Sequence, residues 1–321
     1  PVGWDEFISF TADCVRPLLD FTDKIGFCFS YPTEMFPSGD GRLITLTKQV
    51  LIQDYEGRMI SADLISKLRK PGQKDAKVSL LNDTPAVLLS GVSIGSGSNH
   101  SDYIGLIAGT GTNTACILPT NAVPAASEFN KSNIIINLES GGFNGIERGT
   151  IDFELDAETG DPGTYLFEKM TSGAYLGTIC RLLLWRSYHD GLISPDSAAK
   201  VKALGKFDSS VADSLANGTL KIGGGNDSEL IRELCYSVFD RAAKCVSANL
   251  NAILKLKSKN ASENYRICAD GSVFRKSLIF RKKLEEYTLS FADKRYIKNI
   301  SFSSYENATI YGAAIAAALN N

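Results

Sequence analysis

Apolar residues recur along the chain with two spacings, and together these predict alternating helices and strands. Helical spacing predicts amphipathic helices at 4–20, 61–68, 167–170, 175–188, 228–256, 275–287 and 310–319. Short apolar runs bounded by Gly, Pro or polar residues predict strands at 24–31, 43–48, 78–81, 103–108, 114–118, 134–138 and 266–269. A turn is expected at 37–42, and a loop with a short helix at 205–227. This alternation is typical of an α/β protein.

One junction between a predicted strand and a predicted helix carries an acid. The strand at 78–81 runs into Asn82 and Asp83, then Thr84 suits a helix N-cap and Pro85 the first helical position. Ligand sites of α/β proteins gather outside the carboxyl ends of strands, so Asp83 is a candidate site residue. Taken alone, Asp83 is better explained as a helix cap than as a catalytic residue.

Composition narrows the class of protein. The chain has 321 residues, 44% of them apolar and 22% charged, which suits two lobes or one large α/β unit. The net charge of −2 is spread along the chain and argues against nucleic-acid binding. No stretch approaches the ~20 apolar residues of a membrane span, and we see no signal peptide, so we expect a cytoplasmic protein. The composition carries no signal of oligomeric state.

Cysteine and histidine usage excludes several kinds of chemistry. The seven cysteines are scattered without a C-x-x-C pair, which favours reduced, mostly buried thiols over a disulfide framework or a zinc site. The chain has only two histidines, His100 and His189, which argues against a histidine metal site and against a Ser-His-Asp triad. We therefore expect no metal held by protein side chains.

Polar residues collect where the predicted strands end. They are Ser30, Asn82, Asp83, Asn113 and Glu139, with Glu168 from a nearby helix. Carboxylates and amides bind sugar hydroxyls well, because a hydroxyl both donates and accepts hydrogen bonds. Two turns, 109–112 (GTGT) and 270–272 (DGS), combine glycine with a hydroxyl side chain and suit phosphate oxygens, although GTGT is also a common hairpin sequence. The combination suggests phosphoryl transfer to a sugar.

Six segments resemble, in the same order, six motifs of the hexokinase family. They are 26–32 (GFCFSYP), 81–84 (LNDT), 105–113 (GLIAGTGTN), 137–143 (NLESGGF), 162–177 (PGTYLFEKMTSGAYLG) and 269–274 (ADGSVF). The resemblance covers the chain from about residue 24 to its end. It implies a two-lobed actin-like (ribonuclease-H-like) ATPase fold, with residues 1–82 and 308–321 in the small lobe and 83–307 in the large lobe.

The resemblance also implies roles for residues. Asp83 would be the general base for transfer of the γ-phosphate of ATP to the 6-hydroxyl of glucose or a related hexose. The implied sugar-binding residues are Ser30, Thr47, Lys48, Asn82, Asp83, Asn113, Glu139 and Glu168. The implied nucleotide-binding residues are Gly109, Thr110, Gly111, Thr112, Gly271 and Ser272. Mg²⁺ would be held mainly by the ATP phosphates and water, and the two lobes would close on the sugar.

The chain departs from the family pattern at several points. The family's W-T-K-G-F stands here as 46–50 (LTKQV), and the Trp after the sugar-binding Glu is Ser140. The family's D-G-S-G-x-G-A-A stands as 306–314 (ENATIYGAA). Nothing before Lys24 resembles the family's D-L-G-G-T-N-like phosphate turn, so we expect a fold that is incomplete at its N-terminus, and poor ATP turnover by these residues alone.

Two rival functions follow from these departures. Ser140 motivates an N-acetylhexosamine kinase, because lost bulk beside the sugar would admit a larger substituent. The altered loops motivate a hexokinase-like sugar sensor with little catalysis. Retention of Asn82 and Asp83 argues against the sensor, because a binding protein has little need of a base.

Overall fold

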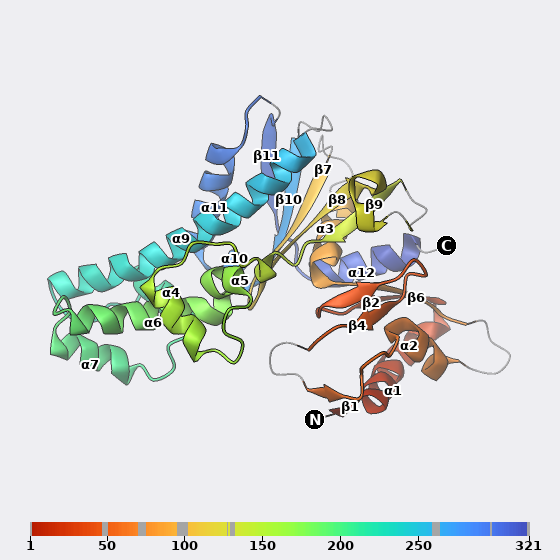
Figure 1. Cartoon of the computed structure of the whole chain (residues 1–321), viewed down its shortest axis with the longest axis horizontal. Coiled ribbons are helices and arrows are strands. Elements are labelled where there is room, and N and C mark those ends of the chain that lie inside the picture. Colours follow the sequence, from red (N-terminus) through yellow and green to blue (C-terminus); the bar gives the residue numbers. More distant parts are fainter. Residues whose placement is uncertain are drawn as a thin grey trace.

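The computed structural model describes residues 2–46, 51–69, 75–94, 102–126, 128, 132–258, 264–295 and 297–319. The first part of the chain forms a small group of short strands and two helices (Figure 1). Its elements are β1 (Val2–Gly3), α1 (Trp4–Val15), a 3₁₀ helix (Arg16–Asp20), β2 (Lys24–Cys28), β3 (Thr33–Met35), β4 (Gly41–Leu43), β5 (Ile52–Gln53), α2 (Ile60–Leu68) and β6 (Lys77–Leu81). β2 pairs with β6 in parallel. Trp4, Ile8, Ile60 and Leu64 are fully buried beneath them.

The rest of the chain is built on a five-stranded sheet in the order β11-β10-β7-β8-β9. The strands are β7 (Asp102–Ala108), β8 (Thr112–Pro119), β9 (Asn133–Asn137), β10 (Asn264–Asp270) and β11 (Asn299–Ser303). β10 runs parallel to β7 and β11, whereas β7, β8 and β9 form an antiparallel meander. The carboxyl ends of β7 and β10 therefore meet at one edge of the sheet.

Helices enclose this sheet and extend away from it (Figure 1). They are α3 (Asp83–Ile94), α4 (Thr150–Glu158), α5 (Leu166–Thr171), α6 (Gly173–His189), α7 (Pro195–Ala203), α8 (Ser209–Ala216), α9 (Asn226–Ser258), α10 (Ser272–Lys276) and α11 (Leu278–Phe291). One continuous apolar core joins the sheet to α6, α8, α9 and α11, with Leu106, Leu176, Phe239 and Phe274 buried in it.

The final helix, α12 (Ala308–Leu319), lies between α3 and the β2–β6 pair (Figure 1). Two glycines allow this contact. A Cβ added to Gly26 would lie 1.9 Å from the Ala313 carbonyl oxygen, and one added to Gly312 would lie 1.9 Å from the Ala86 carbonyl oxygen. Helix and strand backbones therefore touch directly, so the end of the chain is fixed against its first half.

Most predicted elements are confirmed, and several of their details are wrong. The strand predicted at 24–31 ends at Cys28, and the turn predicted at 37–42 ends at Asp40, because 41–43 pairs with β3. The strand predicted at 43–48 is wrong for residues 44–46, which belong to no strand. Residues 47–48 lie outside the described residues. α4, α7 and β11 were not predicted. Among the described residues, no helix has the length and apolar character needed to cross a membrane.

All seven cysteines lie in the described part of the chain, and all are free thiols. Cys116, Cys180, Cys235 and Cys268 are buried, as expected, whereas Cys14 is exposed. Burial raises the pKa of the Cys268 thiol to about 11, so this buried thiol is protonated and unreactive at neutral pH.

Candidate active site

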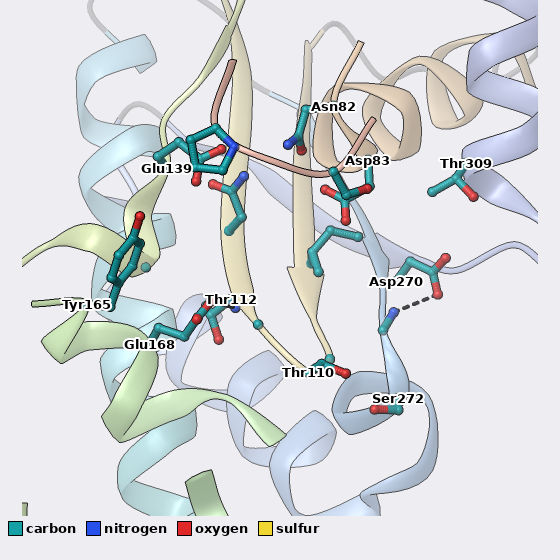
Figure 2. Close-up of a pocket in the computed structure, with 18 of the residues that line it drawn as sticks. Asn82, Asp83, Thr110, Thr112, Glu139, Tyr165, Glu168, Asp270, Ser272 and Thr309 are labelled. Carbon is teal, nitrogen blue, oxygen red and sulfur yellow. Dashed lines mark hydrogen bonds between the residues drawn. The ribbon is translucent and has the colours of Figure 1, made fainter. Parts of the chain in front are cut away.

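A cavity of about 560 Å³ opens between the two parts of the molecule, where β6, β7, β9 and β10 end and β8 begins (Figure 2). Every predicted site residue in the described part of the chain lines it. These residues are Ser30, Asn82, Asp83, Gly109, Thr110, Gly111, Thr112, Asn113, Glu139, Glu168, Gly271 and Ser272. Thr47 and Lys48, the other two, lie outside the described residues. Side chains scattered over the sequence therefore converge on one cavity.

Asp83 begins α3 and directs its carboxylate into the cavity (Figure 2). The predicted cap at Thr84 is wrong. The Asn82 side-chain oxygen accepts the Thr84 N–H at 3.1 Å, so Asn82, two residues earlier, caps the helix. The Thr84 hydroxyl donates to the Asp83 carboxylate at 3.2 Å. Because Asn82 caps the helix, the Asp83 carboxylate is not used as the cap and remains directed into the cavity.

A chain of amides fixes Glu139 on the neighbouring wall. The Asn113 amide donates to the Asn137 side-chain oxygen at 2.7 Å, and the Asn137 amide donates to Glu139 at 2.7 Å. The Asn113 oxygen accepts the Thr114 N–H at 2.7 Å. Glu139 itself has a left-handed backbone, with φ 47°. These bonds orient both the amide and the carboxylate before any ligand binds.

Glu168 is held from two directions. Its Oε2 accepts the Thr112 N–H at 3.0 Å, which ties α5 to β8. The next residue, Lys169, is buried, and its ammonium donates to Asp156 at 2.8 Å and to the Asp161 carbonyl at 2.8 Å. Burial disfavours the charged form of Lys169, but Asp156 and Asp161 more than offset this, so its pKa is raised. The buried ion pair anchors the helix that carries Glu168.

The two predicted phosphate turns touch each other through their backbones. A Cβ on Gly109 would lie 3.2 Å from the Gly271 Cα, and a Cβ on Gly271, whose φ is 111°, would lie 2.4 Å from the Ala108 carbonyl carbon. The Gly109 carbonyl accepts the Gly173 N–H, which begins α6, at 2.7 Å. Glycine is required at 271 and a side chain at 109 would be tightly packed, and backbone exposed in this way can approach phosphate oxygens closely.

Several lining residues were not named as site residues, although one of them, Asp270, belongs to the predicted phosphate turn at 270–272. They are Pro32, Ile107, Gly141, Asp161, Tyr165, Tyr175, Asp270, Arg275 and Thr309. Asp270 accepts the Gly271 N–H at 2.6 Å and pairs with the Arg275 guanidinium at 3.1 Å. Tyr165 immediately precedes α5 and has a left-handed backbone, so helical spacing from Glu168 gave no signal that could have found it. Burial and the carboxylates of Glu139, Glu168 and Asp161 raise the pKa of the Tyr165 hydroxyl, which therefore stays neutral.

Ser140 does not line this cavity. It faces a second, mainly apolar cavity of about 1000 Å³ on the other side of the 139–142 loop, lined also by Phe143, Phe167 and Ala248. The small side chain of Ser140 therefore leaves space towards α9 rather than beside the candidate sugar site. This placement weakens the reason for expecting a substituted sugar.

The lining of the main cavity is chemically compatible with phosphates that carry their own Mg²⁺. Within the described ranges, no three His, Cys, Asp or Glu side chains form a cluster that would hold a metal ion. The lining acids Asp83, Asp161 and Asp270 would repel a bare triphosphate, and Mg²⁺ bound to the phosphates would relieve that repulsion. The glycine backbones at 109 and 271 offer the close approach that phosphates need.

Comparison with solved structures defines the class of fold. A hexokinase from Schistosoma mansoni complexed with glucose superposes with a TM-score of 0.75 at 23% identity, covering 99% of this chain and 76% of that one. A ROK family glucokinase from Streptomyces griseus in complex with glucose and AMPPNP gives a TM-score of 0.58 at 15% identity, covering 99% and 88%. The chain therefore has the two-lobed, actin-like ATPase fold, as predicted.

Sequence comparison places the chain within that class. Two family models, both described as hexokinase, match residues 4–92 and 103–319. Hexokinase-7 of Oryza sativa subsp. japonica is 29% identical over 93% of this chain and 69% of its own length. Hexokinase-1 of Homo sapiens is 30% identical over 84% of this chain and 32% of its own length. The chain spans only 63% of the rice Hexokinase-9. The chain belongs to the hexokinase family.

Proposed function

We propose that this protein transfers the γ-phosphate of ATP to the 6-hydroxyl of glucose or a related hexose, with Asp83 as the general base. One observation carries the proposal. The Asp83 carboxylate faces a cavity with amides and carboxylates along one wall and two glycine turns along another. A base in this position can take the hydroxyl proton as the oxygen attacks phosphorus, an effect worth about 10²–10⁴-fold in rate.

The acceptor sugar would lie against Asn82, Asn113, Glu139 and Glu168, with Ser30 across the cavity. The bonds from Asn137 to Glu139 and from the Thr112 N–H to Glu168 leave each carboxylate oriented and able to accept further hydrogen bonds. A site prepared in this way discriminates against sugars that lack a hydroxyl, because its own groups would then be buried unpaired. Thr47 and Lys48 are proposed to complete the sugar contacts.

The nucleotide phosphates would lie over Gly109, Thr110, Gly111 and Thr112, and beside Gly271 and Ser272. When bound, Mg²⁺ supplies positive charge that stabilises the transferring phosphoryl group. The lobes formed by 1–82 with 308–321 and by 83–307 would close around the substrates, which would limit transfer to water. We place this reaction in the cytoplasm.

The fold by itself does not decide between a kinase and a sugar sensor. A ROK family transcriptional regulator has the same fold, with a TM-score of 0.58 at 14% identity. Retention of a carboxylate at the start of α3, held by hydrogen bonds and aimed into the cavity, favours catalysis. A protein that only binds sugar has no proton to remove.

Turnover measurements separate these functions. Coupled assays of the full-length protein with MgATP and a panel of glucose, mannose, fructose and N-acetylglucosamine should show turnover of glucose or another unsubstituted hexose. Asp83→Ala should lower kcat by about 10²–10⁴-fold. Asp190→Asn, at an exposed residue after α6, is the matched control and should leave turnover unchanged. Negligible rates in both the parent protein and Asp83→Ala would favour the sensor, and turnover of N-acetylglucosamine alone would favour the hexosamine kinase.

A further inference from the structure

Tyr165 has a backbone conformation that non-glycine residues rarely adopt. Its φ of 51° and ψ of 37° lie in the left-handed region, and it immediately precedes α5. Outliers of this kind persist where the surrounding structure determines them, and they gather at ligand sites. Tyr165 is therefore a candidate for a role beyond packing.

The surrounding hydrogen bonds hold Tyr165 in this conformation. The Asn144 side-chain oxygen accepts the Leu166 N–H at 3.1 Å, and the Phe143 carbonyl accepts the Phe167 N–H at 3.1 Å. On the other flank, the buried Lys169 ammonium binds the Asp161 carbonyl at 2.8 Å. Both sides of Tyr165 are thus fixed before a ligand arrives.

The ring of Tyr165 forms one wall of the cavity. A Cβ on Gly142 would lie 4.0 Å from the Tyr165 Cε1, so the ring rests near the backbone of the 139–142 loop. Its electrostatic neighbours are Glu139, Glu168 and Asp161. In Figure 2, Asp83 is drawn across the cavity from Tyr165. The ring is therefore at the end of the candidate sugar site that is remote from the proposed base.

The geometry of a pyranose then defines what Tyr165 would meet. The reacting C6 is attached to C5, and the ring atom opposite C5 is C2. Resting on the proposed function, which puts the 6-hydroxyl at Asp83, we propose that Tyr165 is a specificity-determining residue that packs against the C2 end of the hexose. The site takes hexoses with a small substituent at C2 and excludes those with an acylamino group there.

The neighbouring groups agree with this assignment. A C2 hydroxyl has Glu139 and Glu168 within the same wall as acceptors, while the aromatic face covers adjacent C–H bonds. An acylamino group at C2 would instead collide with the ring. The space left by Ser140 does not relieve that collision, because Ser140 lines the cavity on the other side of the loop.

The test removes the ring while keeping the left-handed backbone. Tyr165→Gly and Tyr165→Asn both tolerate positive φ, and Tyr165→Phe removes only the hydroxyl. Dissociation constants for glucose, mannose and N-acetylglucosamine would be measured by calorimetry. Tyr188→Ala is the folding control, because Tyr188 is a half-buried tyrosine that does not line the cavity.

The Gly and Asn variants should bind glucose about tenfold more weakly and shift the affinity ratio about tenfold or more towards N-acetylglucosamine. The Phe variant and the Tyr188→Ala control should keep the parent ratio. An unchanged ratio in both the Gly and Asn variants would overturn the inference, as would a parent protein that binds N-acetylglucosamine more tightly than glucose. Because binding is measured without ATP, the inference still holds if sugar binds as described but no phosphate is transferred, which would overturn only the proposed function.

Discussion

One wall of the cavity is formed mainly by side chains, and the other is formed mainly by the backbone. The wall with Asn113, Glu139 and Glu168 presents side chains that other groups hold in place. The wall with Gly109 and Gly271 presents backbone, packed so closely that a Cβ on Gly271 would lie 2.4 Å from the Ala108 carbonyl carbon. Recognition of a sugar needs placed carboxylates and amides, whereas a phosphate can be bound by backbone N–H groups. Truncating a side chain should therefore damage the first wall, and adding a methyl group should damage the second.

The largest expected effect comes from the ion pair beneath the side-chain wall. Lys169→Met leaves Asp156 buried without its main partner, and such a break costs about 3–5 kcal/mol. Denaturant unfolding should show this loss, together with weaker glucose binding. Lys200→Met, which removes an exposed pair with Asp196, should cost under about 1 kcal/mol. Equal losses in both variants would show that the buried pair does not anchor this wall.

The ion pair between Lys169 and Asp156 also predicts how the stability of the protein depends on pH. Burial would raise the pKa of Asp156, but Lys169, the Gly163 N–H and Arg148 lower it below its ordinary value. A lowered carboxyl pKa contributes stability that is present above the unfolded pKa of about 4 and is lost as pH falls through the folded pKa. The melting temperature should therefore fall below about pH 4. Asp156→Asn should make that fall shallower, and an unchanged slope would contradict this assignment.

The next effect tests the backbone wall. Gly271→Ala forces a side chain into a φ of 111° and against the Ala108 carbonyl, and we expect a loss of about 2–4 kcal/mol in the free energy of unfolding. Gly160→Ala is the matched control, because nothing lies within 4 Å of its added Cβ. Thermal denaturation of the two variants would make the comparison. If Gly271→Ala is as stable as the parent protein, the backbones of the 109–112 and 270–272 turns do not pack in close contact.

A smaller effect is expected from Glu168→Gln. Replacing a carboxylate with an amide weakens a charged hydrogen bond worth about 1.5–3 kcal/mol, so the Kd for glucose should rise by about 10- to 150-fold. The KM for ATP should stay nearly constant. Glu158→Gln, at an exposed residue that ends α4, supplies the control. A larger change in the KM for ATP than in glucose affinity would show that Glu168 acts on the nucleotide rather than on the sugar.

The smallest effect is expected from Ser272→Ala. If the second wall acts mainly through its backbone, removing this hydroxyl should cost about 0.5–1.5 kcal/mol, or about 2- to 13-fold in the KM for ATP. Steady-state kinetics at saturating glucose would measure it. A loss exceeding that of Glu168→Gln would erase the distinction between the walls.

The sequence predicted much of this arrangement, for physical reasons. Strand ends can be read from apolar runs, so the sequence placed Asp83 and Glu139 just after strands, and both line the cavity. Elements with weak patterns were missed. α4 (Thr150–Glu158) has little apolar periodicity, and β11 (Asn299–Ser303) mixes polar and apolar residues at the edge of the sheet.

Tertiary contacts explain what the sequence could not show. Tyr165 reaches the cavity because the buried Lys169 anchors the preceding loop, and no local spacing reveals that contact. The direction of Ser140 depends on the left-handed backbone of Glu139, which turns the following residue away from the site. The small size of Ser140 therefore does not by itself create space beside the sugar.

The central claim is transfer to the 6-hydroxyl inside this cavity, and the position of the phosphate on the product tests it most directly. Glucose labelled with ¹³C would be incubated with MgATP and the purified protein, and the product would be followed by ¹³C and ³¹P NMR. The account predicts glucose 6-phosphate from the parent protein and almost none from Asp83→Asn. Phosphate on another hydroxyl, or release of inorganic phosphate without a sugar phosphate, would contradict it.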